Sequence, residues 1–130
     1  MSAARSRRLQ VLIVDDDTRV LAAMSNLLHT ESVETVTADS STAARRRVAH
    51  ARFDLALIDI LLPGPADGLV LVADLVPRMP VIATSINPAL RCAALAAGAT
   101  AFAEKDGLTD DLLHLIHQTA HRTRIPENTP

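Results

Sequence analysis

The amino-acid sequence predicts an α/β fold, with a five-stranded parallel sheet and helices on both of its faces. Five short apolar runs alternate with five segments whose apolar residues recur at helical spacing, and this alternation is typical of a parallel sheet. The first run, Leu9 to Val14 (LQVLIV), is mostly apolar and rich in β-branched residues, as expected of a strand buried on both faces. At 130 residues the chain has the length of one domain of this kind.

The strands are expected where the apolar runs lie. They cover, in chain order, Leu9–Val14, Val33–Ala38, Leu55–Ile58, Val81–Ser85 and Ala101–Glu104. The polar stretches at the two ends of the chain are expected to lie outside the domain. We therefore predict one domain over residues 9–122, between a disordered basic tail (1–8) and a C-terminal tail (123–130).

Each helix is expected to begin at a residue that can accept a hydrogen bond from a first-turn N–H, or at a proline. Five helices are predicted: one capped by Thr18, with apolar positions Leu21, Met24, Leu27 and Leu28; one from Ser40-Ser41-Thr42 to about His50; one over Gly68–Val76, capped by Asp67 and ended by Pro77; one from Pro88 to Ala97, ended by Gly98; and one from a Thr109 cap to about Arg122.

The composition excludes several classes of function. A formal net charge of −2 gives no general attraction to nucleic acid or anionic membranes, and an aromatic content of 2% leaves no platform for stacking bases. The one cysteine, Cys92, excludes an internal disulfide and is expected to be a small packing residue. No segment approaches the roughly 20 apolar residues of a membrane helix. We predict a cytoplasmic protein without direct contact with nucleic acid or membrane.

Two further polar clusters are expected to form exposed helix faces. Arg45, Arg46 and Arg47 are consecutive in the second helix and are interpreted as a solvated face. His114, His117 and His121 share one face of the last helix, a spacing that could also hold a transition metal, but we favour simple exposure.

The chemically informative residues stand where the predicted strands end. In a parallel sheet, ligands bind in the crevice beyond the carboxyl ends of the strands. Lys105 is the only lysine beside twelve arginines, and it follows the fifth strand. The full set at this edge comprises Asp15, Asp16 and Asp17 after the first strand, Asp59 after the third, Thr84 and Ser85 at the end of the fourth, Glu104 at the end of the fifth, and Lys105 directly after it.

Such a set of carboxylates predicts a cation site and phosphoryl chemistry. Carboxylates in one crevice repel each other, and they remain ionised together only when a cation neutralises them. A few carboxylate oxygens with room for water and phosphate describe Mg²⁺ better than Zn²⁺ or Ca²⁺. A magnesium ion beside a carboxylate nucleophile favours attack on a phosphoryl group, which a lysine can also contact. We therefore predict phosphorylation of Asp59.

The order of these residues resembles the receiver (CheY-like) domain of bacterial two-component response regulators. The resemblance rests on the Asp15-Asp16 pair after a strand, Asp59 with Pro63 four residues later, Asp67-Gly68, a strand ending in Thr/Ser, and Lys105 after Ala97-Gly98-Ala99. It covers residues from about Leu9 to Arg122. It implies a flavodoxin-like strand order, 2-1-3-4-5.

The resemblance also implies a role for each site residue. Asp59 would accept a phosphoryl group from a histidine kinase or a histidine phosphotransfer protein. Asp16, Asp59 and the backbone carbonyl of Leu61 would ligate Mg²⁺, with Asp15 acting through water. Lys105 would contact the acyl phosphate. A hydroxyl on the fourth strand, Ser85 or alternatively Thr84, and the switch aromatic Phe102 would then respond to phosphorylation.

The expected output is a change in protein binding and not an enzymatic turnover. In the family, phosphorylation repacks the face formed by the fourth helix, the fifth strand and the fifth helix. The chain is expected to be a stand-alone receiver of a phosphorelay signal transduction system, whose output is a downstream protein partner, a phosphate relay or a homodimer.

Three points in the sequence leave alternatives open. Counting from Pro80 selects Ser85 as the switch hydroxyl, and the bulky Ile86 then follows where a small residue is common, which would restrict access to the site. Asp15 and Asp17 have the D-x-D spacing of magnesium-dependent phosphohydrolases with an aspartyl nucleophile. A receiver-like interaction module that is not phosphorylated is the third interpretation.

Overall fold

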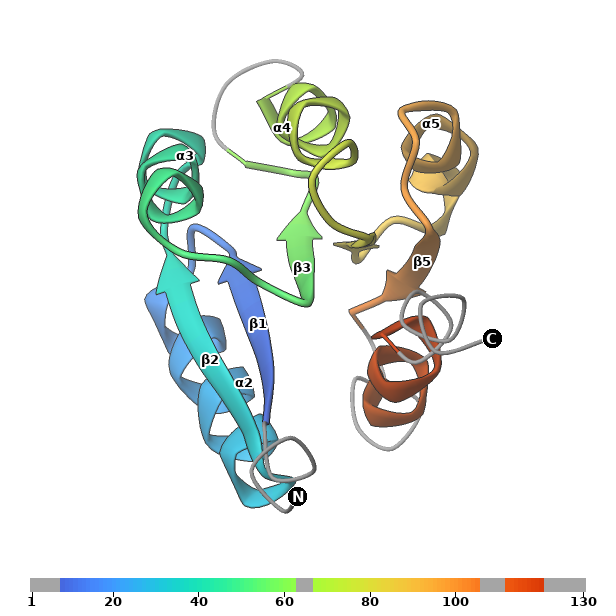
Figure 1. Cartoon of the computed structure of the whole chain (residues 1–130). Coiled ribbons are helices and arrows are strands. Elements are labelled where there is room, and N and C mark those ends of the chain that lie inside the picture. The colour runs from blue at the N-terminus through green and yellow to red at the C-terminus, as the bar shows by residue number, and fades with distance from the viewer. Residues whose placement is uncertain (1–7, 63–66, 106–111, 121–130) are drawn as a thin grey trace, which may run out of the picture.

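The computed structural model describes residues 8–62, 67–105 and 112–120, and within them the predicted fold is confirmed. Five parallel strands form one sheet in the order β2-β1-β3-β4-β5, with helices on both sides (Figure 1). The strands are β1 (Leu9–Val14), β2 (Val33–Ala38), β3 (Leu55–Asp59), β4 (Val81–Ser85) and β5 (Ala101–Glu104).

The helices occupy the segments between the strands. They are α2 (Thr18–Thr30), α3 (Ser41–His50), α4 (Asp67–Leu75) and α5 (Arg91–Ala96), and a short 3₁₀ helix, η1 (Pro88–Leu90), leads directly into α5. Residues 112–120 are also helical. Among the described residues, no helix has the length and apolar character needed to cross a membrane.

Alternate residues of the buried strands divide the core into two layers. Val11 and Ile13 of β1 face α2 and the helix over residues 112–120, and they belong to one apolar cluster. Leu12 and Val14 face the opposite way, into a second cluster that includes residues of α3, α4 and α5. Because both faces of the sheet are covered, the central strands carry apolar residues at nearly every position. Figure 1 shows α3, α4 and α5 on one side of the sheet and α2 on the other.

Three helix boundaries differ from the sequence prediction. The cap of α2 is Asp17, whose side chain accepts a hydrogen bond from the Arg19 N–H, and Thr18 is the first helical residue. Asp67 is the first residue of α4 and not its cap, and the helix ends at Leu75. The fourth predicted helix is divided into η1 and α5.

Two glycines allow segments of backbone to meet. Gly98 follows α5 with φ +108°, a left-handed conformation that favours glycine. A Cβ on Gly68 would lie 2.2 Å from the carbonyl oxygen of Ile60, so only glycine lets the first turn of α4 approach the chain beyond β3 this closely. This approach sets the path of the residues that follow Asp59.

Other expectations concern exposure. His114 and His117 are exposed, as predicted, while Cys92 is exposed and not a packing residue, so that prediction was wrong. His121, the Thr109 cap, residues 1–7 of the N-terminal tail and the tail over residues 123–130 lie outside the described residues.

Candidate functional site

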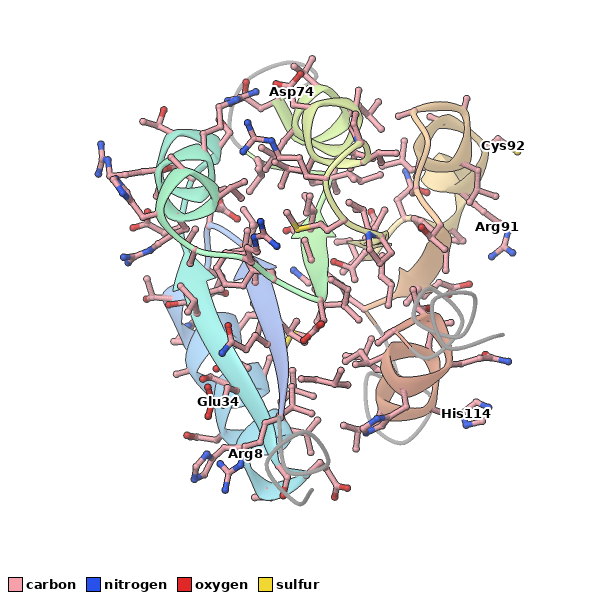
Figure 2. The ribbon with its side chains drawn as sticks, viewed as in Figure 1. Arg8, Glu34, Asp74, Arg91, Cys92 and His114 are labelled. Atoms are coloured by element: carbon pink, nitrogen blue, oxygen red, sulfur yellow. The ribbon has the colours of Figure 1, made fainter. Side chains whose placement is uncertain are left out.

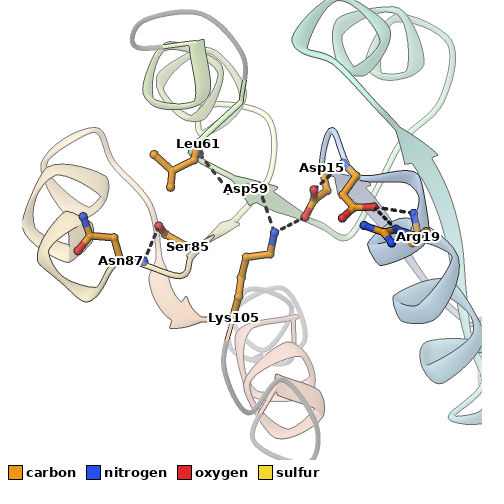
Figure 3. Close-up of polar contacts among 8 residues, drawn as sticks. Asp15, Arg19, Asp59, Leu61, Ser85, Asn87 and Lys105 are labelled. Carbon is orange, nitrogen blue, oxygen red and sulfur yellow. Dashed lines mark hydrogen bonds and ion pairs between the residues drawn. The ribbon is translucent and has the colours of Figure 1, made fainter.

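The carboxyl edge of the sheet brings together side chains that are far apart in the sequence. Asp15 directly follows β1, Asp59 and Ser85 are the last residues of β3 and β4, and Lys105 directly follows β5. Side chains along a strand point alternately to the two faces of the sheet. Asp15, Asp59 and Lys105 therefore lie on the same face as Ile13, Leu57 and Ala103, which is the face covered by α2. Figure 3 shows the Lys105 side chain extending between the two aspartates.

A repeated hydrogen-bond pattern fixes the end of three strands. Asp15 Oδ1 accepts a hydrogen bond from the backbone N–H two residues later, at 2.9 Å. Asp59 Oδ1 accepts one from the Leu61 N–H at 2.9 Å, and Ser85 Oγ accepts one from the Asn87 N–H at 3.0 Å. Asp and Ser favour such turns because their short side chains can bond to the backbone two residues on. The same bond therefore ends the strand and orients the side chain.

Lys105 is a cation that contacts both buried carboxylates. Its Nζ donates to Asp15 Oδ2 at 2.7 Å and to Asp59 Oδ2 at 3.2 Å. Asp15 is 3% exposed and Asp59 is 5% exposed, and buried charges are costly unless they are paired and hydrogen-bonded. Burial lowers the pKa of Lys105, but the hydrogen bond to Asp15 and the charges of both aspartates outweigh it, so the pKa is raised above its ordinary value.

Asp15, Asp16 and Asp59 have the donor atoms of a metal site. One carboxylate oxygen from each lies within 4.8 Å of the others, and Asp16 is exposed to solvent. A set of carboxylate oxygens suits a hard cation such as Mg²⁺, and these three side chains fit that ion in kind and in position. Leu61, whose carbonyl is the fourth predicted ligand, lies in the same loop, with its N–H bonded to Asp59.

Asp17 does not join this cluster. Its side chain accepts the N–H of Arg19 at 2.9 Å as the cap of α2 and pairs with the exposed Arg19 guanidinium. The hydrogen bond from the Arg19 backbone, followed by the one from its side chain, holds the pKa of Asp17 below its ordinary value. The D-x-D interpretation requires Asp15 and Asp17 to act on one substrate, and this arrangement counts against it.

The two candidate hydroxyl residues lie on opposite faces of β4. Thr84 pairs in register with Asp59, and the alternation of β4 places it on the face of Ile82, beneath α2. Ser85 is fully buried and shares the opposite face with Ala83. That face also holds Phe102, whose register partner on β4 is Ala83. Ser85 and Phe102 are thus near neighbours on one face of adjacent strands.

Two exposed apolar side chains stand beside the buried site. Leu61 is 49% exposed and follows Asp59 by two residues, while Ile86 is 65% exposed and follows Ser85 directly. Most large apolar residues in the described chain are buried. Each therefore places an apolar side chain in solvent within two residues of a buried polar residue of the site.

The sequence prediction missed two residues that shape this edge. Asn87 links Ser85 to the next helix: its N–H bonds to Ser85 Oγ, and its Oδ1 accepts the Ala89 N–H that begins η1. An asparagine immediately before Pro88 is a recognisable helix-start signal. The role of Gly68 against Ile60 has no such local signal, because the contact is tertiary.

Known proteins resemble this chain in sequence. The sequence model of the response regulator receiver domain matches residues 11–117. The heme response regulator HssR of Staphylococcus aureus is 31% identical over 125 residues, which cover 93% of this chain and 55% of HssR. The chain therefore spans about half the length of the curated relatives it matches.

Solved structures share the fold. A CheY-like receiver domain protein from Methanospirillum hungatei aligns with a TM-score of 0.83 and 29% identity, covering 92% of this chain and 99% of that one. NtrX from Brucella abortus aligns with a TM-score of 0.85 and 25% identity, covering 93% of this chain and 29% of NtrX.

Proposed function

The chain belongs to the response regulator receiver domain family, and on that basis we propose that it accepts a phosphoryl group on Asp59 from a histidine kinase or a histidine phosphotransfer protein. Such an exchange makes the chain a signalling phosphoacceptor and not a turnover enzyme. We propose the cytoplasm as the compartment where it occurs.

The observation that carries this proposal is the position of Lys105 between two buried carboxylates. In the transfer, an Asp59 oxygen forms a bond to phosphorus while the donor's phosphorus–nitrogen bond breaks, and the electron pair leaves with the donor imidazole. The Lys105 ammonium already contacts Asp59 Oδ2 at 3.2 Å, so a phosphoryl group on Asp59 would come within its reach. A compact ammonium suits a phosphoryl oxygen as a point charge.

The charge balance supports a role for Mg²⁺. Asp15, Asp16 and Asp59 carry −3 together and Lys105 carries +1, which leaves −2 at the site. A phosphoryl group adds further negative charge, about −1.5 to −2 on an ordinary phosphorylated residue. We propose that Asp16, Asp59 and the Leu61 carbonyl hold Mg²⁺, with Asp15 acting through water. When bound, the ion would neutralise charge on the phosphoryl oxygens.

For the response to phosphorylation we propose Ser85 as the switch hydroxyl and Phe102 as the aromatic that follows it. The shared face of Ser85 and Phe102 supports this choice over Thr84, which faces away from Phe102. The Ser85 carbonyl also accepts the Lys105 N–H at 2.9 Å. A shift of Ser85 would therefore displace both the end of β5 and the segment that leads to α5.

We propose that the output is altered binding of a protein partner, or of a second copy, through the surface formed by α5, β5 and the helix over residues 112–120. The exposed Leu95 of α5 supplies an apolar residue to this surface.

Intact-mass measurement tests the proposal. Incubation with acetyl phosphate and Mg²⁺ should add one phosphoryl group to the wild-type chain and none to Asp59→Asn. Asp74→Asn is the matched control, because Asp74 is an exposed carboxylate on α4, and it should be labelled like the wild type. An unlabelled wild type, or equal labelling of Asp59→Asn, would refute the assignment.

A further inference from the structure

A groove between α3 and α4 lies away from the carboxyl edge and has no part in the chemistry described above. Its volume is about 330 Å³, and it is lined by Arg45, Val48, Ala49, Asp74, Leu75 and Arg78. The two helices lie next to each other on the same side of the sheet (Figure 1). The buried side chains of Val48 and Leu75 belong to the core beneath them, so the floor of the groove is apolar while its borders are charged.

Arg45 is held in position with part of its guanidinium free. Its Nη2 donates to Asp74 Oδ2 at 2.6 Å across the groove, and both side chains remain about half exposed. The other N–H groups of Arg45 have no partner among the described residues. The Arg78 side chain is exposed on the far border, and its guanidinium makes no hydrogen bond or ion pair with any described residue; only its backbone N–H is bonded, to the Leu75 carbonyl. Figure 2 shows Asp74 on α4, well separated from Arg91 on α5.

The charge of this side of the molecule differs from that of the chain as a whole. The chain carries a net charge of −2, and the acidic cluster of Asp15, Asp16 and Asp59 stands at the carboxyl edge. By contrast, α3 contributes three arginines and no acid. Arg52 and Arg78 follow α3 and α4 and are exposed. Among the described residues, Asp74 is the one carboxylate that lines the groove.

We propose that the groove between α3 and α4 binds an acidic peptide segment of a partner protein, in which a carboxylate side chain lies next to an apolar one. Free guanidinium N–H groups favour a carboxylate, to which they can donate two hydrogen bonds. The apolar floor of Val48 and Leu75 favours a neighbouring aliphatic group, whose burial adds to the binding. This site is separate from Asp59, and the proposal does not depend on phosphorylation.

Asp74 argues against a nucleic-acid backbone as the occupant. Its carboxylate borders the groove and would repel a continuous polyanion, and a sugar–phosphate chain offers no aliphatic side chain for the apolar floor. A peptide can place one carboxylate against Arg78 and the free side of Arg45 while leaving Asp74 exposed to solvent. The shape and the charge of the groove therefore favour a protein ligand.

Amide NMR of the isotope-labelled chain tests this proposal. The probe is a tetrapeptide that alternates leucine and glutamate, acetylated at its N-terminus and amidated at its C-terminus, and the control probe has glutamine in place of glutamate. We expect saturable shifts centred on the amides of Ala49 and Leu75. The glutamine peptide should bind about tenfold more weakly, which is about 1.4 kcal/mol, because it cannot form the charge-assisted hydrogen bonds.

Matched variants locate the binding. Arg45→Gln and Arg78→Gln should each reduce the affinity for the glutamate peptide, whereas Arg91→Gln, which removes an exposed charge on α5, should leave it unchanged. The Arg78 side chain has no polar partner among the described residues, so its variant separates the effect on binding from an effect on folding. The amide spectrum of each variant reports the fold.

Several outcomes would overturn the proposal. Equal affinity for the two peptides, or no saturable shift, would show that the groove does not bind a carboxylate specifically. An equal loss in Arg91→Gln would show a diffuse effect of surface charge. Tighter binding of a short oligothymidylate at the same amides would identify a nucleic-acid site instead.

Discussion

The ends of β1 and β3 differ from the end of β4 in how firmly their side chains are held. Asp15 and Asp59 each have one oxygen bonded to a backbone N–H and the other to Lys105. Ser85 Oγ has a single hydrogen bond among the described residues, and it comes from Asn87. The helix that begins near Asp15, α2, has 13 residues, while η1 and α5 beyond Ser85 have only 3 and 6.

We interpret this difference as a division of the edge into two regions. The reactive region holds Asp15, Asp59 and Lys105, and the responsive region is the β4–η1–α5 segment. Asp59, the proposed phosphoacceptor, is already assembled with Asp15 and Lys105, so the proposed transfer needs little reorganisation, as expected of an efficient electrostatic site. The β4–η1–α5 segment is held by a short series of hydrogen bonds and can change at lower cost. The following predictions test that division, from the largest expected effect to the smallest.

Lys105→Met should produce the largest loss of stability, because it leaves Asp15 and Asp59 buried without a cation. Breaking a buried ion pair from one side costs about 3–5 kcal/mol, and we expect about 3 kcal/mol because the Lys105 side chain is 17% exposed. Urea unfolding without divalent ions measures the loss, and added Mg²⁺ should recover part of it. Arg91→Met is the control and should unfold like the wild type. Equal midpoints for the two variants would show that Lys105 does not stabilise the acidic cluster.

Gly68→Ala should weaken the reactive region through its backbone. The new methyl group would lie 2.2 Å from the Ile60 oxygen, and over-packing of this kind costs about 1–3 kcal/mol. Because Ile60 adjoins Asp59, labelling by acetyl phosphate should also slow. Unfolding midpoint and labelling rate are measured together. A loss of stability with an unchanged labelling rate would mean that the contact supports only the fold.

Asn87→Ala should act on the responsive region. It removes the acceptor for the Ala89 N–H at the start of η1, and the loss of such a cap costs about 1 kcal/mol. Asn26→Ala on the exposed side of α2 removes an asparagine whose side chain has no hydrogen bond among the described residues, and it should be nearly neutral. Hydrogen exchange should quicken in η1 and α5 and remain unchanged in α2. Uniform quickening would contradict a separate β4–η1–α5 unit.

Ile86→Ala should have the smallest effect, and it should change only the access of acetyl phosphate to Asp59. Ile86 is 65% exposed, so its truncation should leave the unfolding midpoint unchanged. Truncating this exposed side chain should raise the labelling rate with acetyl phosphate by about threefold, which corresponds to less than 1 kcal/mol of barrier. Leu95→Ala, which truncates another exposed apolar side chain, should not change the rate. A rate for Ile86→Ala at or below that of the wild type would show that the side chain does not limit entry.

The sequence predicted the sheet and most of the site because both depend on local patterns. Continuous apolar runs mark buried strands, and the parallel arrangement brings their carboxyl ends to one edge. The sequence alone could therefore predict that Asp15, Asp59 and Lys105 lie close together. In the structure, Lys105 Nζ is within hydrogen-bonding distance of both aspartates.

The features that the sequence did not predict depend on tertiary detail. Asp17 and Thr18 are both good caps, and only the path of the chain selects Asp17. The exposure of Cys92 depends on which side of a six-residue helix meets the core. The groove formed by Arg45 and Arg78 needs two helices to be placed side by side, and no pattern within either helix indicates it.

The position of the phosphoryl group within the chain tests the central claim most directly. After labelling with acetyl phosphate and Mg²⁺, borohydride reduction converts an acyl phosphate to an alcohol, and tandem mass spectrometry locates it in the tryptic peptide over residues 53–78. That peptide carries Asp54, Asp59, Asp67 and Asp74, so it contains its own controls. We predict reduction at Asp59 alone, dependent on Mg²⁺. Reduction at another aspartate, or none in a labelled chain, would contradict the assignment.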